Sequence, residues 1–322
     1  MVSIGDWDDP QTGPNDVIVR VASCGLCGTD RHIVEGSYPA TYPNVLGHEI
    51  SGVVAELGSA VRDLTSGDRV AIDPNISDGT CAACRRGDVH LCEHLQAIGV
   101  TRPGGMAAFV SVPAPQAHRI PESLSLAAAA FAEPLSCIVH GLERVRLPLG
   151  GHVVVIGAGS IGLMMLQALR SIGAGNVVVS EPSAAKRAIA EALGADEVYA
   201  PQMLDHESHE SAYDLVVDCS GVADMLRDDV RLARRGADVL MFGVPPQGKT
   251  TVTEPYALYR KELRMIASNI NPFTMEKAIA LLAEGAVNVD SIVSTVVTLD
   301  DLPSLLRSPA APTEVKAALR FS

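Results

Sequence analysis

The stretch that decides the fold reads Val153-Val-Val-Ile156-Gly157-Ala-Gly-Ser-Ile-Gly162. Its apolar start predicts a buried strand, and helix-forming residues then continue through Ile172. In this setting the first glycine permits a tight turn, the second lets the backbone approach a pyrophosphate, and the third lets helix and strand pack closely. The N-terminus of the helix attracts the phosphates. The stretch therefore predicts a dinucleotide site, with these candidate cofactor-binding residues: Gly157, Gly159, Ser160, Ile161 and Gly162.

An acidic residue follows the next predicted strand, Asn176–Ser180. Glu181 lies 19 residues after Gly162, where a carboxylate can hold the adenosine ribose hydroxyls and repel a 2′-phosphate. This position favours NAD over NADP. Lys186 and Arg187 are close enough to meet a phosphate, so NADP remains the less favoured alternative, and their other interpretation is an ordinary solvated helix face.

Strand and helix patterns alternate around this stretch. Ala184–Leu193 has a helical pattern, and Asp214–Asp218 and Val239–Phe242 have strand patterns. Strands separated by helical segments predict a parallel sheet with crossover helices. The fold class is therefore α/β, with a doubly wound Rossmann sheet in the middle of the chain.

The first 120 residues have a different texture, rich in glycine, proline and short β-branched runs. Such runs between turn residues predict a small β-barrel or sandwich. The runs are Val17–Val21, Ser51–Ala55, Asp68–Ile72 and Ala107–Val112. After about residue 265 the pattern predicts a helix over Met275–Ala283, a strand over Val293–Thr298 and a short helix over Asp301–Leu306.

Composition narrows the class of protein. With 322 residues, 47% of them hydrophobic, the chain has enough material for two packed domains. Its formal net charge of −13 disfavours nucleic acid and anionic membranes as partners. The acidic N-terminus lacks the basic flank of a secretory signal, so we expect a cytoplasmic protein with no membrane partner.

Cysteine usage points to metal. Five of the seven cysteines fall within the first 92 residues, and such close spacing favours metal binding over disulfides. Cys27 and His48, with a carboxylate from Glu49 or Glu133, would supply sulfur, nitrogen and oxygen donors that suit Zn²⁺. Three protein ligands leave the fourth position that catalysis requires.

These motifs carry a resemblance to a known family. Cys27-Gly-Thr-Asp-Arg-His32, Gly47-His-Glu49, Glu133-Pro-Leu135 and the Gly157–Gly162 loop occur in this order in the zinc-dependent medium-chain alcohol dehydrogenases. The resemblance covers nearly the whole chain, and Glu133-Pro-Leu135 is most similar to the sorbitol, polyol and threonine dehydrogenase branch. It implies a GroES-like β-barrel catalytic domain at 1–134, a Rossmann domain inserted at 135–265, and a segment at 266–322 that returns to the catalytic domain.

The resemblance also assigns roles around a catalytic zinc. Cys27 and His48 would hold the ion, and Glu49 or Glu133 would complete its shell directly or through water. Asp30 would orient His48 through its other ring nitrogen. Which glutamate is the third ligand stays open, so Glu49 is a candidate both as ligand and as catalytic residue.

Three further residues match functional positions of the family. Thr29 and His32 match its proton-relay positions, and Lys186 matches a lysine that contacts the ribose. The resemblance implies oxidation of a secondary, polyol-like alcohol to a ketone, with hydride transfer to NAD and a homodimer or homotetramer as the assembly. Two rival readings are a zinc-independent reductase of quinones or enones and a non-catalytic NAD-binding structural or sensor protein.

A second segment resembles the structural-zinc lobe of the family, with one change. The family has four cysteines there, and this chain has Asp78 at the first position, followed by Cys81, Cys84 and Cys92. A carboxylate oxygen can ligate zinc, so an Asp/Cys₃ site is chemically reasonable. Loss of the metal is the alternative, and His90 and His94 are less favoured substitute ligands.

The family also has a strand before the segment matching Val2–Pro10. We therefore expect either an internal start or a barrel that lacks one strand.

Overall fold

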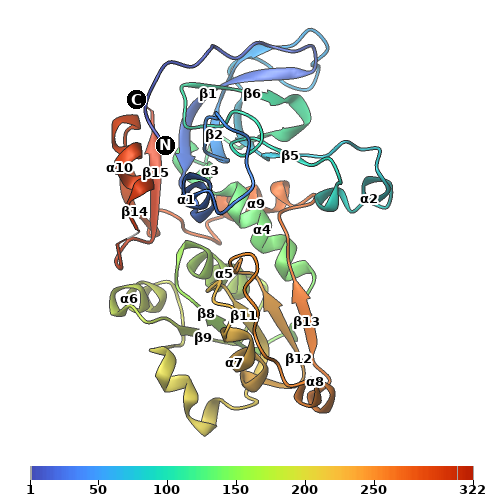
Figure 1. Ribbon diagram of the computed structural model, residues 1–322, viewed down its shortest axis with the longest axis vertical. Helices are drawn as coiled ribbons and strands as arrows, with labels where there is room; N and C mark the ends of the chain where they lie inside the picture. The colour runs from blue at the N-terminus through green and yellow to red at the C-terminus, as the bar shows by residue number, and fades with distance from the viewer. Residues whose placement is uncertain (1, 310, 322) are drawn as a thin grey trace. The chain divides into compact units, whose positions relative to one another are not determined.

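In the computed structural model, which describes residues 2–309 and 311–321, the chain divides into two compact units (Figure 1). Unit 1 comprises residues 1–136, 271–285 and 293–322, and unit 2 comprises 137–270 and 286–292. The first divisions lie at 136 and 270, against the predicted 134 and 265. Residues 286–292 group with unit 2, although we expected the whole tail in the catalytic domain.

Unit 1 is built on a seven-stranded sheet in the order β14-β15-β1-β2-β3-β7, with β6 also paired to β1. Alternating apolar residues of β1, such as Val17, Val19 and Val21, point into the core because successive side chains of a strand face opposite sides. The strands are β1 (Asp16–Gly25), β2 (Glu49–Leu57), β3 (Arg69–Ile72), β6 (Phe109–Pro113), β7 (Ala117–Arg119), β14 (Val293–Val297) and β15 (Lys316–Arg320).

The tail of the chain completes this sheet. β15 pairs antiparallel with the end of β1, with Leu319 opposite Cys24, and β14 pairs parallel with β15. Figure 1 shows β15 near β1, with β14 next to β15. Residues from the two ends of the sequence therefore share one sheet, as the resemblance implies. The described residues before Asp16 form no strand, and Val2 packs against the core.

Short helices surround the sheet, and a lobe projects from it. The helices of unit 1 are α1 (Gly28–Glu35), α3 (Leu126–Ala129), α9 (Met275–Ala283) and α10 (Leu302–Arg307), with 3-10 turns η2 (Ala114–Gln116) and η5 (Leu299–Asp301). α4 (Ala132–Glu143) begins in unit 1 and continues into unit 2. The lobe holds α2 (Ala82–Arg85), η1 (Val89–Leu91) and a two-stranded ribbon of β4 (Asn75–Ile76) and β5 (Gln96–Ala97).

Unit 2 contains a six-stranded parallel sheet in the order β10-β9-β8-β11-β12-β13. Counted along the chain this is the order 3-2-1-4-5-6 of a doubly wound dinucleotide-binding sheet, so the predicted fold class is confirmed. Its strands are β8 (His152–Ile156), β9 (Asn176–Ser180), β10 (Glu197–Tyr199), β11 (Tyr213–Asp218), β12 (Ala233–Met241) and β13 (Arg264–Ala267).

The helices of unit 2 follow its strands. They are α5 (Ser160–Ser171), α6 (Ala184–Ala192), α7 (Met225–Leu232) and α8 (Pro255–Lys261), with 3-10 turns η3 (Pro201–Asp205) and η4 (Glu207–His209). Lys261 Nζ donates to the carbonyls of Val230, Arg231 and Ala233, which satisfies the end of α7. None of the helices in the described part of the chain is long and apolar enough to cross a membrane.

Candidate active site and metal centres

Asp30 connects the two segments that carry the first candidate ligands. Cys27 is the N-cap residue of α1, and its backbone N–H donates to Asp30 Oδ2 over 2.8 Å. The Gly47 N–H donates to Asp30 Oδ1 over 3.3 Å. Asp30 is fully buried. Through these two hydrogen bonds its carboxylate joins the turn at Cys27 to the residues just before β2, which include His48.

His48 lies beside the same carboxylate. Its Nδ1 is 3.6 Å from Asp30 Oδ1, slightly beyond hydrogen-bonding distance, and has no hydrogen-bond partner among the described residues. Burial alone would lower the pKa of His48, but Asp30 and Cys27 outweigh it and raise that pKa well above its usual range. A metal must then displace a proton from the ring, so metal binding weakens as the pH falls.

Glu49 is buried with one oxygen paired and one without a partner. Its Oε1 lies 2.6 Å from Lys316 Nζ, while Oε2 has no hydrogen-bond partner in the described parts of the chain. A Cβ at Gly25, the residue opposite on β1, would lie 2.0 Å from Oε2. Only glycine at position 25 leaves room for this carboxylate.

Glu133 approaches the same group of side chains from the first turn of α4. Burial raises its pKa to about 7, with His48 lowering it and the Glu49 and Asp73 carboxylates raising it further. Glu133 is thus a neighbour of His48 and Glu49 and exists partly as the neutral acid near pH 7. The shift follows from burial among like charges.

The residues present fit a zinc ion. Ligand atoms of Cys27, His48 and Glu49 all lie within 4.8 Å of one another, and this group does not include Glu133. One thiolate, one imidazole and one carboxylate form the donor set of a catalytic zinc site. The partnerless Oε2 of Glu49 is the observation that favours a cation, because a buried carboxylate oxygen without a partner is costly.

The two predicted relay residues lie on α1. Thr29 Oγ1 is 3.6 Å from Cys27 Sγ. His32 is one turn further along the helix, and its half-exposed ring lies 3.4 Å from Ser37 Oγ and 3.5 Å from Glu35. Thr29 therefore lies beside the ligand set, and His32 lies at the solvent. The two residues are three apart, so they share one face of the helix.

The lobe gathers its four predicted ligands. Asp78, Cys81, Cys84 and Cys92 have ligand atoms within 4.8 Å of one another. Cys81 Sγ lies 3.5 Å from Cys84 Sγ and 3.9 Å from Cys92 Sγ. Zn–S bonds of about 2.3 Å in a tetrahedron place sulfurs about 3.8 Å apart, so the spacing fits zinc.

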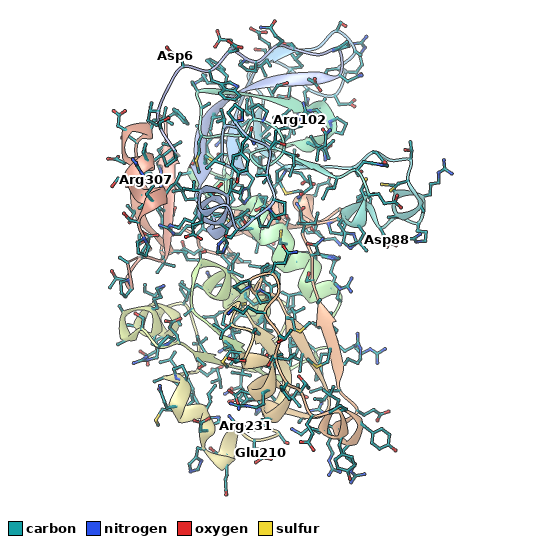
Figure 2. The ribbon with its side chains drawn as sticks, in the orientation of Figure 1. Asp6, Asp88, Arg102, Glu210, Arg231 and Arg307 are labelled. Carbon is teal, nitrogen blue, oxygen red and sulfur yellow. The ribbon has the colours of Figure 1, made fainter. Side chains whose placement is uncertain are left out.

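Backbone N–H groups donate to two sulfurs of the lobe. The N–H of Cys84 donates to Cys81 Sγ, and the N–H groups of Asp78 and His94 donate to Cys92 Sγ, over 3.3 to 3.5 Å. Figure 2 shows Asp88, the residue before η1, on this projecting lobe. The second site therefore has the donors, the spacing and the amide dipoles of a metal site.

The glycine-rich loop of unit 2 forms a cradle. Gly157 has φ of +95°, and a Cβ at Gly162 would lie 1.9 Å from the Gly157 carbonyl oxygen, so neither position tolerates a side chain. No atom lies within 4 Å of a Cβ built on Gly159. Gly159 is the N-cap of α5, and Ser160 and Ile161 follow it in the first turn. Backbone N–H groups at the start of a helix favour an anion in the open space there.

Glu181 reaches back to this loop from the end of β9. Its Oε2 accepts the Ala158 N–H over 2.8 Å, and its Oε1 accepts the Ser183 N–H over 2.9 Å. The Arg187 guanidinium donates to the Glu181 carbonyl, so it holds the backbone, and Lys186 is half-buried on α6. The predicted acid thus lies against the predicted phosphate loop.

Sequence reasoning missed Lys316. It is 4% exposed, and its ammonium lies 5.8 Å from the centre of the Phe131 ring as well as beside Glu49. Burial would lower its pKa, but Glu49, Cys27 and Asp30 raise it, so the lysine stays charged. No local signal could identify it, because its partner is 267 residues away.

Comparison with known proteins agrees with this geometry. Residues 13–122 match the alcohol dehydrogenase GroES-like domain family, and residues 160–284 match the zinc-binding dehydrogenase family. A D-arabinitol dehydrogenase of Uromyces fabae is 31% identical, over 99% of this chain and 93% of its own length. A D-altritol 5-dehydrogenase of Agrobacterium fabrum is 34% identical, over 94% of this chain and 91% of its own.

A solved structure of a zinc-binding dehydrogenase from Sinorhizobium meliloti, bound to NADP, is 42% identical. It superimposes with a TM-score of 0.94 and covers 97% of this chain and 94% of its own. The chain belongs to the zinc-dependent medium-chain alcohol dehydrogenases, in the polyol and sorbitol dehydrogenase-like branch. It is an oxidoreductase that acts on CH–OH groups with NAD(P).

Proposed function

We propose that this protein oxidises a secondary alcohol of a neutral polyol to a ketone, reversibly, with NAD⁺ as the hydride acceptor. The observation that carries the proposal is the convergence of Cys27, His48 and Glu49 in a buried site where Glu49 Oε2 has no hydrogen-bond partner among the described residues. The names of the relatives, a D-arabinitol and a D-altritol dehydrogenase, support the substrate class.

We assign the catalytic zinc to Cys27, His48 and Glu49. Such an ion would supply Lewis acidity that lowers the pKa of a substrate hydroxyl. Asp30 lies beside His48 Nδ1, and Lys316 holds Glu49 through a hydrogen bond to Oε1. Glu133, which lies outside that ligand group, acts beside it as a carboxyl able to hold a proton near neutral pH.

The substrate proton leaves along α1. The Thr29 hydroxyl is positioned beside Cys27 to accept a hydrogen bond from the substrate hydroxyl, and His32 delivers the proton to solvent. Loss of Thr29 should therefore slow the reaction more than loss of His32, because bulk water can replace an exposed relay group.

Removal of a ligand tests the zinc assignment. We expect Cys27→Ala and His48→Ala each to lower kcat by at least about a thousandfold, because Lewis-acid catalysis is lost, while NADH binding persists. NADH formation from a polyol panel, zinc content by mass spectrometry and NADH fluorescence give the three readouts. Cys24→Ala, which removes a buried thiol outside the ligand set, is the matched control. Near-normal turnover in either ligand variant would refute zinc catalysis and favour a zinc-independent reductase.

We also propose that NAD is preferred over NADP. Glu181 is fixed by two backbone N–H groups beside the phosphate loop, where a carboxylate repels a 2′-phosphate. Glu181→Ala should reduce the ratio of kcat/KM for NAD⁺ to that for NADP⁺ by about tenfold or more, since losing about 1.4 kcal/mol of like-charge repulsion already changes the ratio tenfold. Glu191→Ala, which removes an acid from α6, should leave the ratio unchanged. An unaltered preference in Glu181→Ala would remove that residue from cofactor choice.

The lobe ligands Asp78, Cys81, Cys84 and Cys92 are assigned to a second, structural zinc, which predicts two zinc ions per chain. The segments expected near the substrate, Tyr38–Tyr42, Thr101–Gly105 and Asn269–Phe273, contain no cluster of basic residues, which favours a neutral polyol over a phosphorylated one. The homodimer or homotetramer and the cytoplasmic location stay predictions from the sequence.

A further inference from the structure

His94 makes two separate contacts with the ligands of the lobe. Its ring Nδ1 lies 2.6 Å from Asp78 Oδ2. Its backbone N–H donates to Cys92 Sγ over 3.4 Å. One residue outside the four-ligand set thus touches both the first and the last ligand.

The Asp78 carboxylate is held from both of its oxygens. Oδ1 accepts the N–H groups of Thr80 and Cys81 over 2.7 and 2.9 Å, and Oδ2 faces the His94 ring. Without the ring, the carboxylate would be held by the two N–H groups at Oδ1 and by its contact with the Cys84 thiol, and Oδ2 would lose its contact with His94. His94 therefore fixes the plane of the carboxylate.

A fixed carboxylate matters more here than in a four-thiolate site. Zn²⁺ is a borderline-soft ion that a thiolate binds strongly without help, while the oxygen of a partly exposed aspartate competes with water for the same position. In metal sites, partners that orient a ligand are worth about 10- to 100-fold in metal affinity. Because Asp78 stands where a fourth thiolate would bind, a neighbouring imidazole that orients its carboxylate can strengthen metal binding.

We propose that His94 is a positioning residue for the structural metal, which holds Asp78 as the fourth zinc ligand beside Cys81, Cys84 and Cys92. The proposal rests on the proposed assignment of zinc to this lobe. His94 acts through Asp78 and is not itself a ligand, because the group of converging ligand atoms contains Asp78 and does not contain the His94 ring. It follows that His94 is needed only while the first ligand is a carboxylate.

The test is a set of variants of the full-length protein, loaded with zinc and dialysed. The variants are His94→Ala, His94→Asn, Asp78→Ala, Asp78→Cys and the double variant Asp78→Cys/His94→Ala. Arg86→Ala is the control, since it removes an exposed side chain of the same lobe that pairs with Asp88. The readouts are zinc per chain, the apparent Kd for zinc by competition with a chromogenic chelator, and the thiolate-to-metal absorption of the Co²⁺ form.

We expect His94→Ala to weaken zinc binding at the lobe by about tenfold, the low end of the usual range because the ring is largely exposed. His94→Asn should recover part of the loss, because its amide N–H can donate to Oδ2. The decisive result is that His94→Ala costs nothing in the Asp78→Cys background. Changed Co²⁺ absorption in His94→Ala, with the thiolate-to-metal intensity retained, would locate the effect at the oxygen ligand.

Three outcomes would overturn the proposal. Equal zinc affinity of the wild type and His94→Ala, with two zinc ions bound, would leave the lobe site intact and remove His94 from it. A loss in His94→Ala that Asp78→Ala does not share would make His94 the ligand itself. One zinc per wild-type chain, with turnover lost in Cys27→Ala, would remove the lobe site and leave the catalytic proposal standing.

Discussion

The two candidate metal centres of unit 1 are built in opposite ways. The lobe takes all four ligands from residues 78–92, lies partly exposed and is stabilised by neighbouring backbone N–H groups. The catalytic group takes Cys27 from one turn and His48 and Glu49 from another segment, and it is buried with Lys316 from β15. The lobe site forms within one short segment of sequence. The buried site also needs a charged partner that the fold brings from a distant segment.

This contrast predicts that the buried group is sensitive to loss of a partner even without metal. Lys316→Met would leave the Glu49 carboxylate buried and unpaired, and breaking such a pair costs about 3–5 kcal/mol of stability. We expect this loss in urea unfolding of the metal-free protein. Arg86→Met, which breaks the exposed pair with Asp88, is the matched control and should cause no measurable change. Equal stability of Lys316→Met and wild type would show that burial does not distinguish the two centres.

A buried acid in unit 2 sharpens the comparison, because it has no partner at all. Asp229 of α7 is 0% exposed, and neither carboxylate oxygen has a hydrogen-bond partner in the described part of the structure. Burial and the Asp218 and Asp228 carboxylates raise its pKa to about 8. Between about pH 4 and pH 8 the folded chain therefore keeps a proton that the unfolded chain, with an Asp pKa of about 3.9, has lost.

The sign of the effect follows from this difference. Because the folded state binds more protons in that window, stability falls as the pH rises, by about 3 kcal/mol from pH 5 to pH 8 for this one group. Asp229→Asn should remove that part of the pH dependence, so its advantage over the wild type grows with pH. Parallel urea titrations at pH 5 and pH 8 measure it, with Asp224→Asn, an exposed acid before α7, as the control. A constant difference between Asp229→Asn and wild type at both pH values would contradict the shift.

The smallest effect belongs to the exposed lobe. Asp78→Ala should lower the melting temperature of the zinc-loaded protein by a few degrees, because a metal ligand is lost. In the metal-free protein the change should be smaller still, since only local contacts of an exposed side chain disappear. Melting curves with and without zinc compare the two. An equal drop in both would mean that Asp78 supports the lobe structurally and not as a ligand.

Much of the fold could be predicted because local patterns agree with it. The Val153–Gly162 stretch specifies a strand, a turn and a helix by its own chemistry, and the structure has β8 and α5 there. The extent of β12 could not be read from its sequence, because Ala233-Arg-Arg-Gly-Ala237 lacks an apolar pattern and the strand starts six residues before the predicted Val239. α7 was missed since Asp229 is a charged residue on a buried face.

The candidate site divides in the same way. The grouping of Asp78, Cys81, Cys84 and Cys92 could be expected from the resemblance, because all four lie within one short segment. The choice between Glu49 and Glu133 could not, since both residues approach the same group and only distance separates them. The Glu49 side chain fits only because residue 25 is glycine, and Lys316 balances its charge. Both residues are distant from Glu49 in the sequence, so no local pattern indicates them.

The position of Lys316 in β15 bears on the order in which the molecule can assemble during synthesis. β15 emerges from the ribosome after every residue of unit 2, and until then the end of β1 has β2 on one side only and Glu49 lacks its counterion. The cofactor-binding unit can therefore be fully synthesised before the active site has all its residues, because Lys316 is still missing. The segments that carry Cys27 and Glu49 gain their last partners only when β15 has been synthesised.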